Sequence, residues 1–292
     1  MLATLKNILP QSAWYMLLSA FAFALMAVCV KIASSTYHIP VLEIVAARAL
    51  VSALISYVDI KRKGISMWGN NTPWLIARGT VGALALIFVY YAISTLPLAE
   101  ATILQYLHPA FTALLALLFL KEHIQRSTLT CIILGLVGLC IMIQPNFSHD
   151  SYIHYSWLSV GAGLLGAFGS AAAYVIVKKL TKTDDSSVII FYFPIIALPI
   201  SIILLGSDFV IPSLAAVGIL ILVGIFTQIG QVGLTKALHC ADANKATAYA
   251  YVQVLFSILI GWLFFSEIPE LTTIIGGGLI MVGAVINVLW KR

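Results

Sequence analysis

Two stretches of the chain share one pattern. Residues 90–122 read YYAISTLPLAEATILQYLHPAFTALLALLFLKE, and residues 235–267 read TKALHCADANKATAYAYVQVLFSILIGWLFFSE. They align without a gap at an offset of 145 residues, the distance from Glu122 to Glu267, and polar residues recur in step, His108 with Gln253 among them. Hydrocarbon offers no partner to a polar group, so polar side chains of membrane helices face protein or water. The repeated polar stripe therefore predicts two walls of one cavity.

The composition indicates a polytopic membrane protein. Of 292 residues, 61% are hydrophobic and 9% charged, whereas charged residues make up about one-quarter of a soluble domain. The basic residues fall near the ends of apolar segments, so the net charge of +5 orients the protein in a bilayer and does not indicate a nucleic-acid partner. Residues 1–10 carry no cleavage motif, and we expect the first apolar segment to act as the insertion signal.

Ten apolar segments are long enough to form membrane helices. They cover residues 12–30, 39–58, 74–96, 98–120, 129–143, 157–177, 188–205, 213–237, 243–265 and 271–290. The polar stretch 145–156 divides them into five and five. The predicted fold is thus all-α, with ten transmembrane helices in two five-helix repeats, residues 12–144 and 157–290.

The positions of the basic residues predict the orientation. If both termini are cytoplasmic, thirteen Lys and Arg residues fall on the cytoplasmic side and only Lys31 falls outside. This distribution agrees with the preference of basic residues for cytoplasmic loops. Five helices per repeat then place the two repeats in opposite orientations, an architecture typical of secondary transporters with a site near the membrane midplane. The predicted location is the inner membrane, with both termini cytoplasmic.

Polar residues inside the apolar segments are the candidates for that site. Thr102, Gln105, His108 and Thr112 share one helix face by their spacing of three, three and four residues. For Thr and Ser, hydrogen bonds to their own helix are the simpler interpretation; for Gln105, His108 and Gln253 we favour the cavity. Further candidates are Tyr90 and Tyr91, which could equally be interfacial aromatics, Tyr249 beside Gln253, and Gln228 and Gln231, which could instead join helices.

Charged residues near the membrane have their own alternatives. Arg48 lies near mid-membrane and either binds an anionic group of the solute or pairs with another helix. Arg78 follows Trp74 by one turn, so we expect it to extend to the membrane interface. Lys31 is a candidate gate if it pairs with Glu43 or Glu100, but a solvated helix end is the simpler interpretation. His108, Glu43 and Glu100 are the titratable candidates for proton coupling.

Catalytic chemistry finds little support in the sequence. It contains no HExxH, GxSxG, phosphate-binding glycine loop or spacing typical of metal ligands. The four cysteines form no CxxC pair. We therefore expect no cofactor, no metal and no enzymatic activity. An intramembrane enzyme remains the alternative of a different class, since its residues need not be contiguous, and a passive channel would require a continuous polar pore.

Residues 90–122 resemble the signature of the EamA domain of the drug/metabolite transporter superfamily, and residues 235–267 resemble its degenerate second copy. Arg48 and the Ala-Arg-Gly of residues 77–79 are also similar to this family, especially to the branch with S-adenosylmethionine uptake carriers. One departure is Val254, which stands where the first copy has Pro109.

The resemblance implies ten helices in two inverted repeats around a central cavity. By position, it assigns to that cavity Tyr90, Tyr91, Gln105, His108, Gln228, Gln231, Tyr249 and Gln253. The expected function is a secondary transporter, monomeric or homodimeric, that carries a small polar or amphipathic metabolite of amino-acid or amine type by alternating access. S-adenosylmethionine uptake is the alternative.

Overall fold

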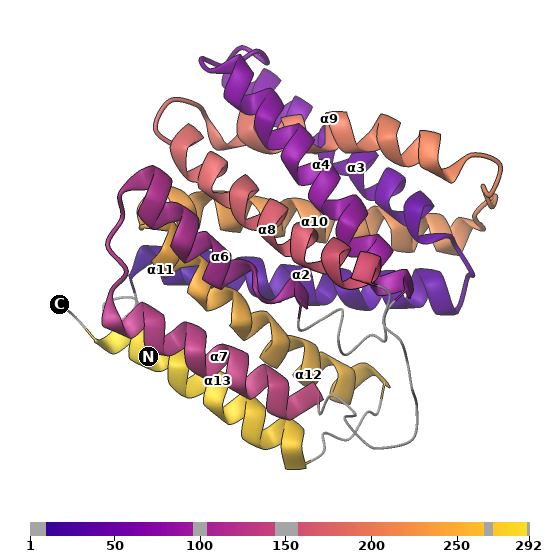
Figure 1. The fold of residues 1–292 in the computed structure, drawn as a ribbon. Helices are drawn as coiled ribbons and strands as arrows, with labels where there is room; N and C mark the ends of the chain where they lie inside the picture. The colour runs from indigo at the N-terminus through magenta and orange to yellow at the C-terminus, as the bar shows by residue number, and fades with distance from the viewer. Residues whose placement is uncertain (1–9, 96–103, 144–156, 266–270, 291–292) are drawn as a thin grey trace.

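The computed structural model describes residues 10–95, 104–143, 157–265 and 271–290 (Figure 1). Regular structure in these residues is helical throughout. The first half forms α2 (Gln11–Ser35), α3 (Val41–Lys63), α4 (Thr72–Thr95), α6 (His108–Leu115), a π-helical turn (Ala116–Leu120) and α7 (Arg126–Ile143). The second half forms α8 (Trp157–Leu180), α9 (Ser186–Leu205), α10 (Leu214–Cys240), α11 (Ala243–Ala248), a 3₁₀ turn (Tyr249–Tyr251), α12 (Val252–Phe265) and α13 (Leu271–Leu289). Each apolar segment predicted from the sequence overlaps described helical residues.

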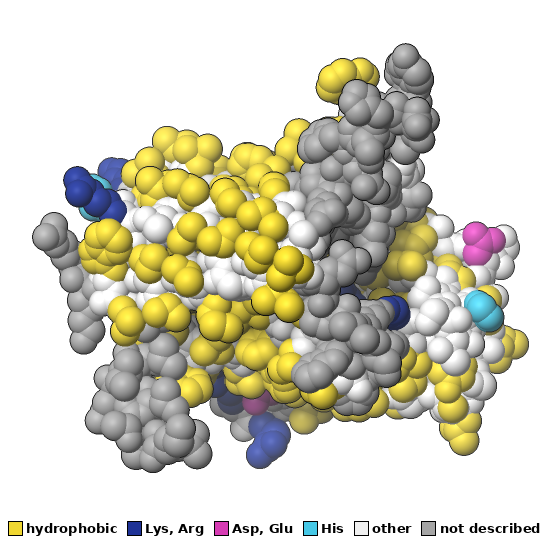
Figure 2. Space-filling view, turned by 90° about the horizontal axis from the view of Figure 1, so that it is seen from below, with side chains coloured by type: hydrophobic (Ala, Val, Ile, Leu, Met, Phe, Trp, Pro, Cys, Tyr) yellow, Lys and Arg dark blue, Asp and Glu magenta, His cyan; other side chains and the backbone are white. Residues whose placement is uncertain are grey.

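Many of these helices are suited to a bilayer. Six in the described residues are long and apolar enough to cross a membrane: α2, α3, α4, α8, α9 and α10. Large hydrophobic side chains such as Leu54 and Ile203 are exposed, at 57% and 77%. Figure 2 shows hydrophobic side chains spread over the described part of one face, with few charged side chains among them. Lipid contact accounts for such a surface, which would be a liability in a soluble monomer.

Helices from the two halves pack in antiparallel pairs. In the pair α7 and α13, Thr128 donates to Asn287 at 3.2 Å, while Gly138 lies against Gly276 farther along. A Cβ added at Gly138 would lie 2.5 Å from the Gly276 carbonyl oxygen, so glycine permits this close approach. Figure 1 shows this pair along one side of the molecule and α3, α4 and α9 on the other.

Glycine also brings α4 and α8 together. A Cβ at Gly166 would lie 2.7 Å from the Val89 side chain, and one at Gly169 would lie 2.8 Å from the Ala85 side chain. Small residues at these positions let the two helices approach closely, as is common between membrane helices. This contact fixes α4 and α8 as two neighbouring walls around the centre of the molecule.

The apolar core differs between the two ends of the bundle. At the end where α2 begins and α10 ends, one cluster of buried residues joins α2, α3, α4, α6, α8, α9, α10 and α11, with Met16, Leu180 and Leu238 among its members. We call this the basic end, because Lys63, Lys121, Lys178, Lys182 and Lys236 lie there. Toward the opposite end, separate clusters form, one among α2, α3 and α10 and another around Ala92.

Candidate functional site

A cavity of about 200 Å³ lies near the middle of the bundle. Its walls come from α2, α4, α8 and α10, with further side chains from α3, α9, the residues around the start of α6 and the turn before α12. The polar side chains that line it are Ser19, Arg48, Arg78, Gln105, Tyr106, His108, Ser170, Tyr174, Gln231 and Gln253. Among the described residues that line it there is no Asp or Glu. The described part of the lining thus carries fixed positive charge and many polar groups but no carboxylate.

The orientation of the His108 ring follows from the proline beside it. Pro109 has no backbone N–H, so it cannot donate to the carbonyl of Gln105 four residues earlier. His108 Nδ1 lies 3.0 Å from that oxygen. A carbonyl oxygen only accepts hydrogen bonds, so Nδ1 carries the hydrogen and donates it.

The other nitrogen of His108, Nε2, is buried and has no hydrogen-bond partner in the described part of the chain. The residue is 8% exposed and lines the cavity. The Tyr174 ring stands edge-on to the imidazole, with the two centroids 5.4 Å apart. In the neutral ring Nε2 therefore offers an unused acceptor to whatever occupies the cavity.

Two arginines contact one aromatic ring at the cavity wall. The guanidinium carbons of Arg48 and Arg78 lie 5.9 and 5.2 Å from the centroid of Phe193. Arg48 Nη1 donates to the sulfur of Met26 at 3.9 Å, a weak contact. The Nε atoms of both arginines are buried without a hydrogen-bond partner in the described residues.

Arg78 corrects an interpretation made from the sequence. We expected its side chain to extend to the membrane interface, but it is 4% exposed and lines the cavity. The reason is that α4 begins at Thr72 and packs against both α8 and α9, so the side of the helix that carries Arg78 faces the centre of the bundle. Position along a helix gave the depth of this residue but not the direction of its side chain.

Five of the predicted site residues meet in the cavity: Arg48, Gln105, His108, Gln231 and Gln253. Tyr106, which lies just before α6, and Tyr174, which lies on α8, also line the cavity. Two threonines of the repeated stripe, Thr112 and Thr247, are not among the lining residues, and Thr102 falls outside the described residues. Thr112 donates to the His108 carbonyl at 2.7 Å and Thr247 donates to the Ala243 carbonyl at 2.8 Å, so both are bonded within their own helices.

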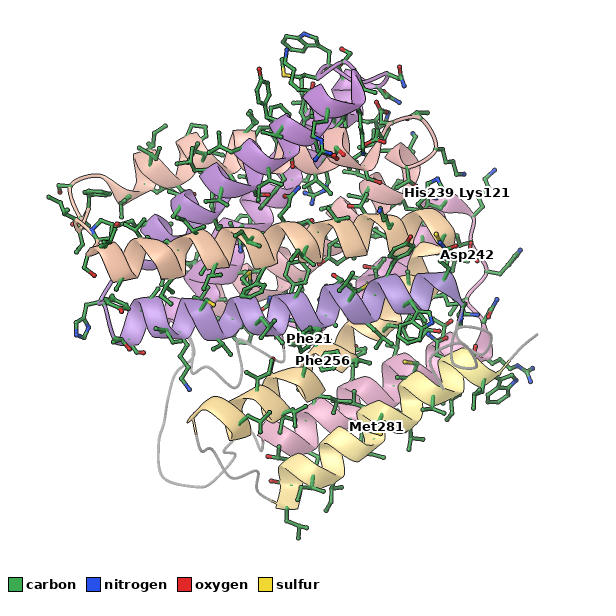
Figure 3. The ribbon with its side chains drawn as sticks, turned by 180° about the vertical axis from the view of Figure 1, so that it is seen from behind. Phe21, Lys121, His239, Asp242, Phe256 and Met281 are labelled. Atoms are coloured by element: carbon green, nitrogen blue, oxygen red, sulfur yellow. The ribbon has the colours of Figure 1, made fainter. Side chains whose placement is uncertain are left out.

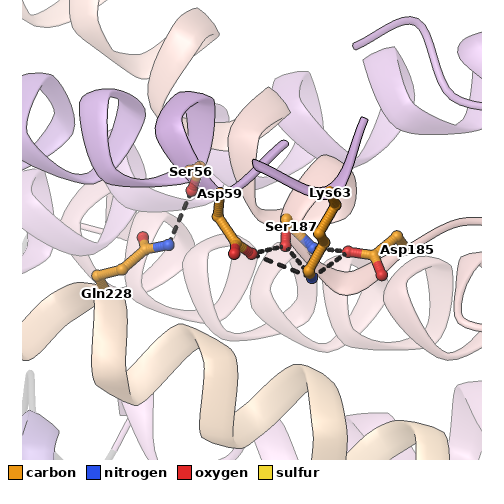
Figure 4. Close-up of polar contacts among 6 residues, drawn as sticks. All are labelled: Ser56, Asp59, Lys63, Asp185, Ser187 and Gln228. Carbon is orange, nitrogen blue, oxygen red and sulfur yellow. Dashed lines mark hydrogen bonds and ion pairs between the residues drawn. The ribbon is translucent and has the colours of Figure 1, made fainter. Parts of the chain in front are cut away.

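Gln228 lies one helical turn from Gln231 but has a different environment. Ser52 donates to its Oε1 atom. Its Nε2 atom donates to Ser56 at 2.8 Å, as Figure 4 shows. Gln228 therefore joins α10 to α3 by hydrogen bonds and is not among the described residues lining the cavity. Tyr249 is 2% exposed within the cluster at the basic end, and Tyr91 is 38% exposed; neither is among the lining residues.

The remaining candidates are separate from the cavity or outside the described residues. Lys31 lies in the last turns of α2 with an exposed side chain. Glu43 is buried near the start of α3 and accepts a hydrogen bond from the Val210 N–H at 3.0 Å. Glu100 and the side chain of Tyr90 fall outside the described residues. The gating and coupling roles of Lys31, Glu43 and Glu100 stay predictions.

Contacts that the sequence did not predict hold the junction of α10 and α11 at the basic end. The Glu122 carboxylate accepts from the N–H of Ala243 at 2.9 Å, and from the backbone N–H and side-chain amide of Asn244 at 3.2 and 2.9 Å. Lys178 donates to the carbonyls of Leu238 and Ala241 at 2.8 and 2.7 Å, where α10 ends. An anion thus lies at a helix start and a cation at a helix end, the favourable arrangement for both helix dipoles. Figure 3 shows Lys121, His239 and Asp242 at this same end.

A second polar cluster joins α3 to α9 at the basic end (Figure 4). Lys63 lies 2.9 Å from Asp185 and 3.0 Å from Asp59, and Ser187 donates to Asp59. Asp185 also accepts from the Ser187 N–H at 2.8 Å, which caps α9. Partial burial acts to raise the pKa of Asp185, but the hydrogen bonds from Ser187 and Lys63 outweigh it and hold this pKa below its usual value. The end of α3 is therefore fixed against the start of α9.

Comparison with known proteins identifies the family. The EamA-like transporter family matches residues 11–144 and 157–289. The chain belongs to this family, and it is a membrane transporter of small molecules, not an enzyme.

Individual relatives are named as transporters of several kinds of solute. The pseudopaline exporter CntI of Pseudomonas aeruginosa is 36% identical over 269 residues, which cover 92% of each chain. Human solute carrier family 35 member G1 is 29% identical, over 93% of this chain and 76% of the carrier. The S-adenosylmethionine uptake transporter of Rickettsia bellii is 25% identical over 77% of each. A solved crystal structure superposes with a TM-score of 0.82 at 17% identity, covering 96% of this chain and 97% of that one, which shows a shared fold.

Proposed function

We propose that this protein is a secondary transporter that carries a small polar or amphipathic metabolite of amino-acid type across the inner membrane by alternating access. The observation that carries the proposal is the central cavity, lined by Arg48, Arg78, His108 and glutamines in the middle of apolar helices. Polar groups at this depth need protein, water or solute as partners. The protein acts as a monomer or a homodimer in this proposal.

Unequal packing at the two ends of the bundle supports alternating access. Among the described residues, one apolar cluster shared by eight helices closes the basic end, whereas smaller, separate clusters lie toward the opposite end. A transporter of this type exposes its site to one side at a time by moving helices around a fixed centre. A passive channel would instead need a polar pore through both ends, which the cluster at the basic end interrupts.

The arrangement of ten helices as two inverted five-helix repeats, residues 12–144 and 157–290, belongs to this proposal. It is supported by pairs of helices that hold equivalent places in the two halves. The second helices, α3 and α9, are antiparallel neighbours, because Lys63 at the end of α3 meets Asp185 at the start of α9. The fifth helices, α7 and α13, are antiparallel as well.

The proposed orientation places the basic end, and with it both termini, in the cytoplasm. It rests on the positive charge gathered there, which includes Lys63, Lys121, Lys178 and Lys182. The S-adenosylmethionine alternative finds less support. A sulfonium is a cation, and the described lining holds two arginines and no carboxylate to receive one.

A depletion assay tests the function. Purified protein is reconstituted into liposomes loaded with a mixture of amino acids, amines and other small metabolites, and the lumen is analysed by mass spectrometry over time. We expect protein-dependent loss of particular compounds, slowed by Gln105→Ala and Gln253→Ala but unaffected by Gln11→Ala, which changes an exposed glutamine outside the cavity. If no compound leaves faster than from protein-free liposomes, or if both cavity variants match the wild type, the proposal fails.

A further inference from the structure

We propose that the transported solute carries two carboxylates, one bound by Arg48 and the other by Arg78. This inference rests on the proposed function, since it assigns a substrate class to the same cavity. It concerns the electrostatics of the site and can be tested by binding alone.

The first argument is that no acidic side chain of the described residues balances the positive charge of the two arginines. Arg78 is 4% exposed, and its Nε atom is buried without a hydrogen-bond partner. In the described residues, no Asp or Glu lies within ion-pair distance of Arg48 or Arg78. The ion pairs found there join Lys63 to Asp59 and Asp185. Arginine does not lose its proton in proteins, so it cannot avoid the cost of burial by becoming neutral. A buried charge of this kind is stabilised by an opposite charge that makes hydrogen bonds to it.

The second argument is that the two guanidinium groups are held near each other by one ring. Both lie over Phe193, with their carbons 5.9 and 5.2 Å from its centroid, so they are no more than about 11 Å apart. Contact with an aromatic face orients a guanidinium but leaves its N–H groups available for other partners. Carboxylates match these groups because one guanidinium can donate two parallel hydrogen bonds to the two oxygens. Two such groups on one small molecule would satisfy both arginines.

The rest of the lining is consistent with a dicarboxylate that also carries a donor. His108 Nε2 is buried, unpaired and offers a lone pair when the ring is neutral. Tyr174 also lines the cavity, and its ring centroid lies 5.4 Å from that of His108. An amine or hydroxyl between the carboxylates and His108 would find an acceptor there. Gln105, Gln231 and Gln253 add neutral donors and acceptors without adding negative charge.

The experiment measures how strongly the second carboxylate contributes to affinity. Full-length protein in detergent is titrated by calorimetry with matched pairs that differ by one charge, glutamate against glutamine and glutarate against its monoamide. A hydrogen bond between two charged groups contributes about 1.5–3 kcal/mol. In at least one of the two comparisons, we therefore expect the dicarboxylate to bind at least about tenfold more tightly than the compound with one carboxylate fewer. Glycerol 3-phosphate, which carries both charges on one group, serves as the third arm.

Three variants locate the effect. Arg48→Gln and Arg78→Gln should each weaken dicarboxylate binding by about the same factor and bring it within about twofold of monoamide binding. Arg126→Gln, an exposed arginine at the start of α7, should leave the ratio unchanged. Arg78→Lys keeps the charge but loses the two parallel donors, so it should retain part of the preference. The unfolding temperature without ligand distinguishes a binding role from a structural one: Arg78→Gln should not lower it, because the variant removes an unpaired buried charge.

Several results would overturn the inference. It fails if dicarboxylates and monoamides bind equally or not at all, if both arginine variants keep the preference, or if the phosphate ester binds more tightly than either dicarboxylate. The transporter proposal fails separately. If uncharged compounds are depleted and the depletion does not depend on Arg48 or Arg78, the protein is a transporter but the dicarboxylate proposal fails. If dicarboxylates bind preferentially but no compound is depleted, the anion site stands and the transporter proposal fails.

Discussion

The carboxylate of Glu122 provides the most direct test of how the basic end is closed. Three donors reach it, the N–H groups of Ala243 and Asn244 and the side-chain amide of Asn244, at 2.9 to 3.2 Å. In Glu122→Gln, the charge is lost and one of the two oxygens becomes an NH₂ group that cannot accept. Hydrogen bonds to a charged group contribute about 1.5–3 kcal/mol, against about 0.5–1.5 kcal/mol for neutral ones.

We therefore expect Glu122→Gln to destabilise the start of α11 by about 2 kcal/mol. Since about 1.4 kcal/mol corresponds to a factor of ten, the open form of this junction should become about 30-fold more populated. Hydrogen exchange of the detergent-purified protein, followed by mass spectrometry, measures this change on peptides that cover residues 239–251. A peptide from α4 serves as the internal reference.

Asp242 offers a matched control. It is the residue before α11 begins, yet its side chain makes no capping hydrogen bond. Asp242→Asn should therefore change exchange in the same peptides by no more than about twofold, as expected for a surface substitution within about 0.5 kcal/mol. Equal exchange in Glu122→Gln and the wild type, or a larger effect from Asp242→Asn, would refute the role assigned to Glu122.

Three further predictions concern stability, each read as the unfolding temperature or free energy of the detergent-purified protein. Gly166→Ala should lower the free energy of unfolding by about 1–3 kcal/mol, because the new Cβ forces α8 away from Val89. The control is Gly161→Ala, which has nothing within 4 Å of the new Cβ and should be neutral or stabilise the helix by up to about 1 kcal/mol. Equal effects of the two substitutions would contradict the packing argument. Gln228→Leu should cost about 0.6–1.7 kcal/mol, the range for hydrogen bonds between membrane helices, and leave solute affinity unchanged; a loss of affinity would instead return Gln228 to the cavity. Asp185→Asn keeps an oxygen that can cap α9 but removes the charge that pairs with Lys63, so it should lower the free energy of unfolding by about 0.2–1 kcal/mol at neutral pH. The pKa of Asp185 in the folded protein is lowered. The stabilisation by its charge is therefore complete above the pKa of the unfolded chain, about 3.9, and disappears as the pH falls through the lower pKa of the folded protein. A stability difference between variant and wild type that persists in strong acid would contradict this prediction.

The positions of the helices could be predicted from the sequence because they depend on hydropathy along the chain. The predicted segment 243–265 coincides with α11 through α12, Ala243–Phe265, and the predicted segment 271–290 matches α13 to within one residue. The agreement has a physical reason: backbone N–H and C=O groups in hydrocarbon must form their hydrogen bonds within the helix, so a long apolar segment forms a helix along its length. Repetition of the polar stripe likewise indicated His108 and Gln253, which both line the cavity.

The direction of individual side chains was harder to predict, because it depends on how helices pack. Arg78 was expected at the membrane interface, and Gln228 was grouped with Gln231 although it bonds to α3. Both residues lie on helices that contact several partners, so no single polar face marks the centre of the bundle. The partner of Glu122 is about 120 residues away in the chain, and only folding brings the two together.

The hydrogen bond beside Pro109 has a consequence for how solute and acid–base chemistry are connected. His108 already carries a hydrogen on Nδ1, committed to the Gln105 carbonyl in either charge state of the ring. A second proton can therefore arrive only at Nε2, on the side that lines the chamber. If a solute binds Nε2, as we propose, protonation of the imidazole and binding of the solute use the same nitrogen, and each changes the affinity for the other.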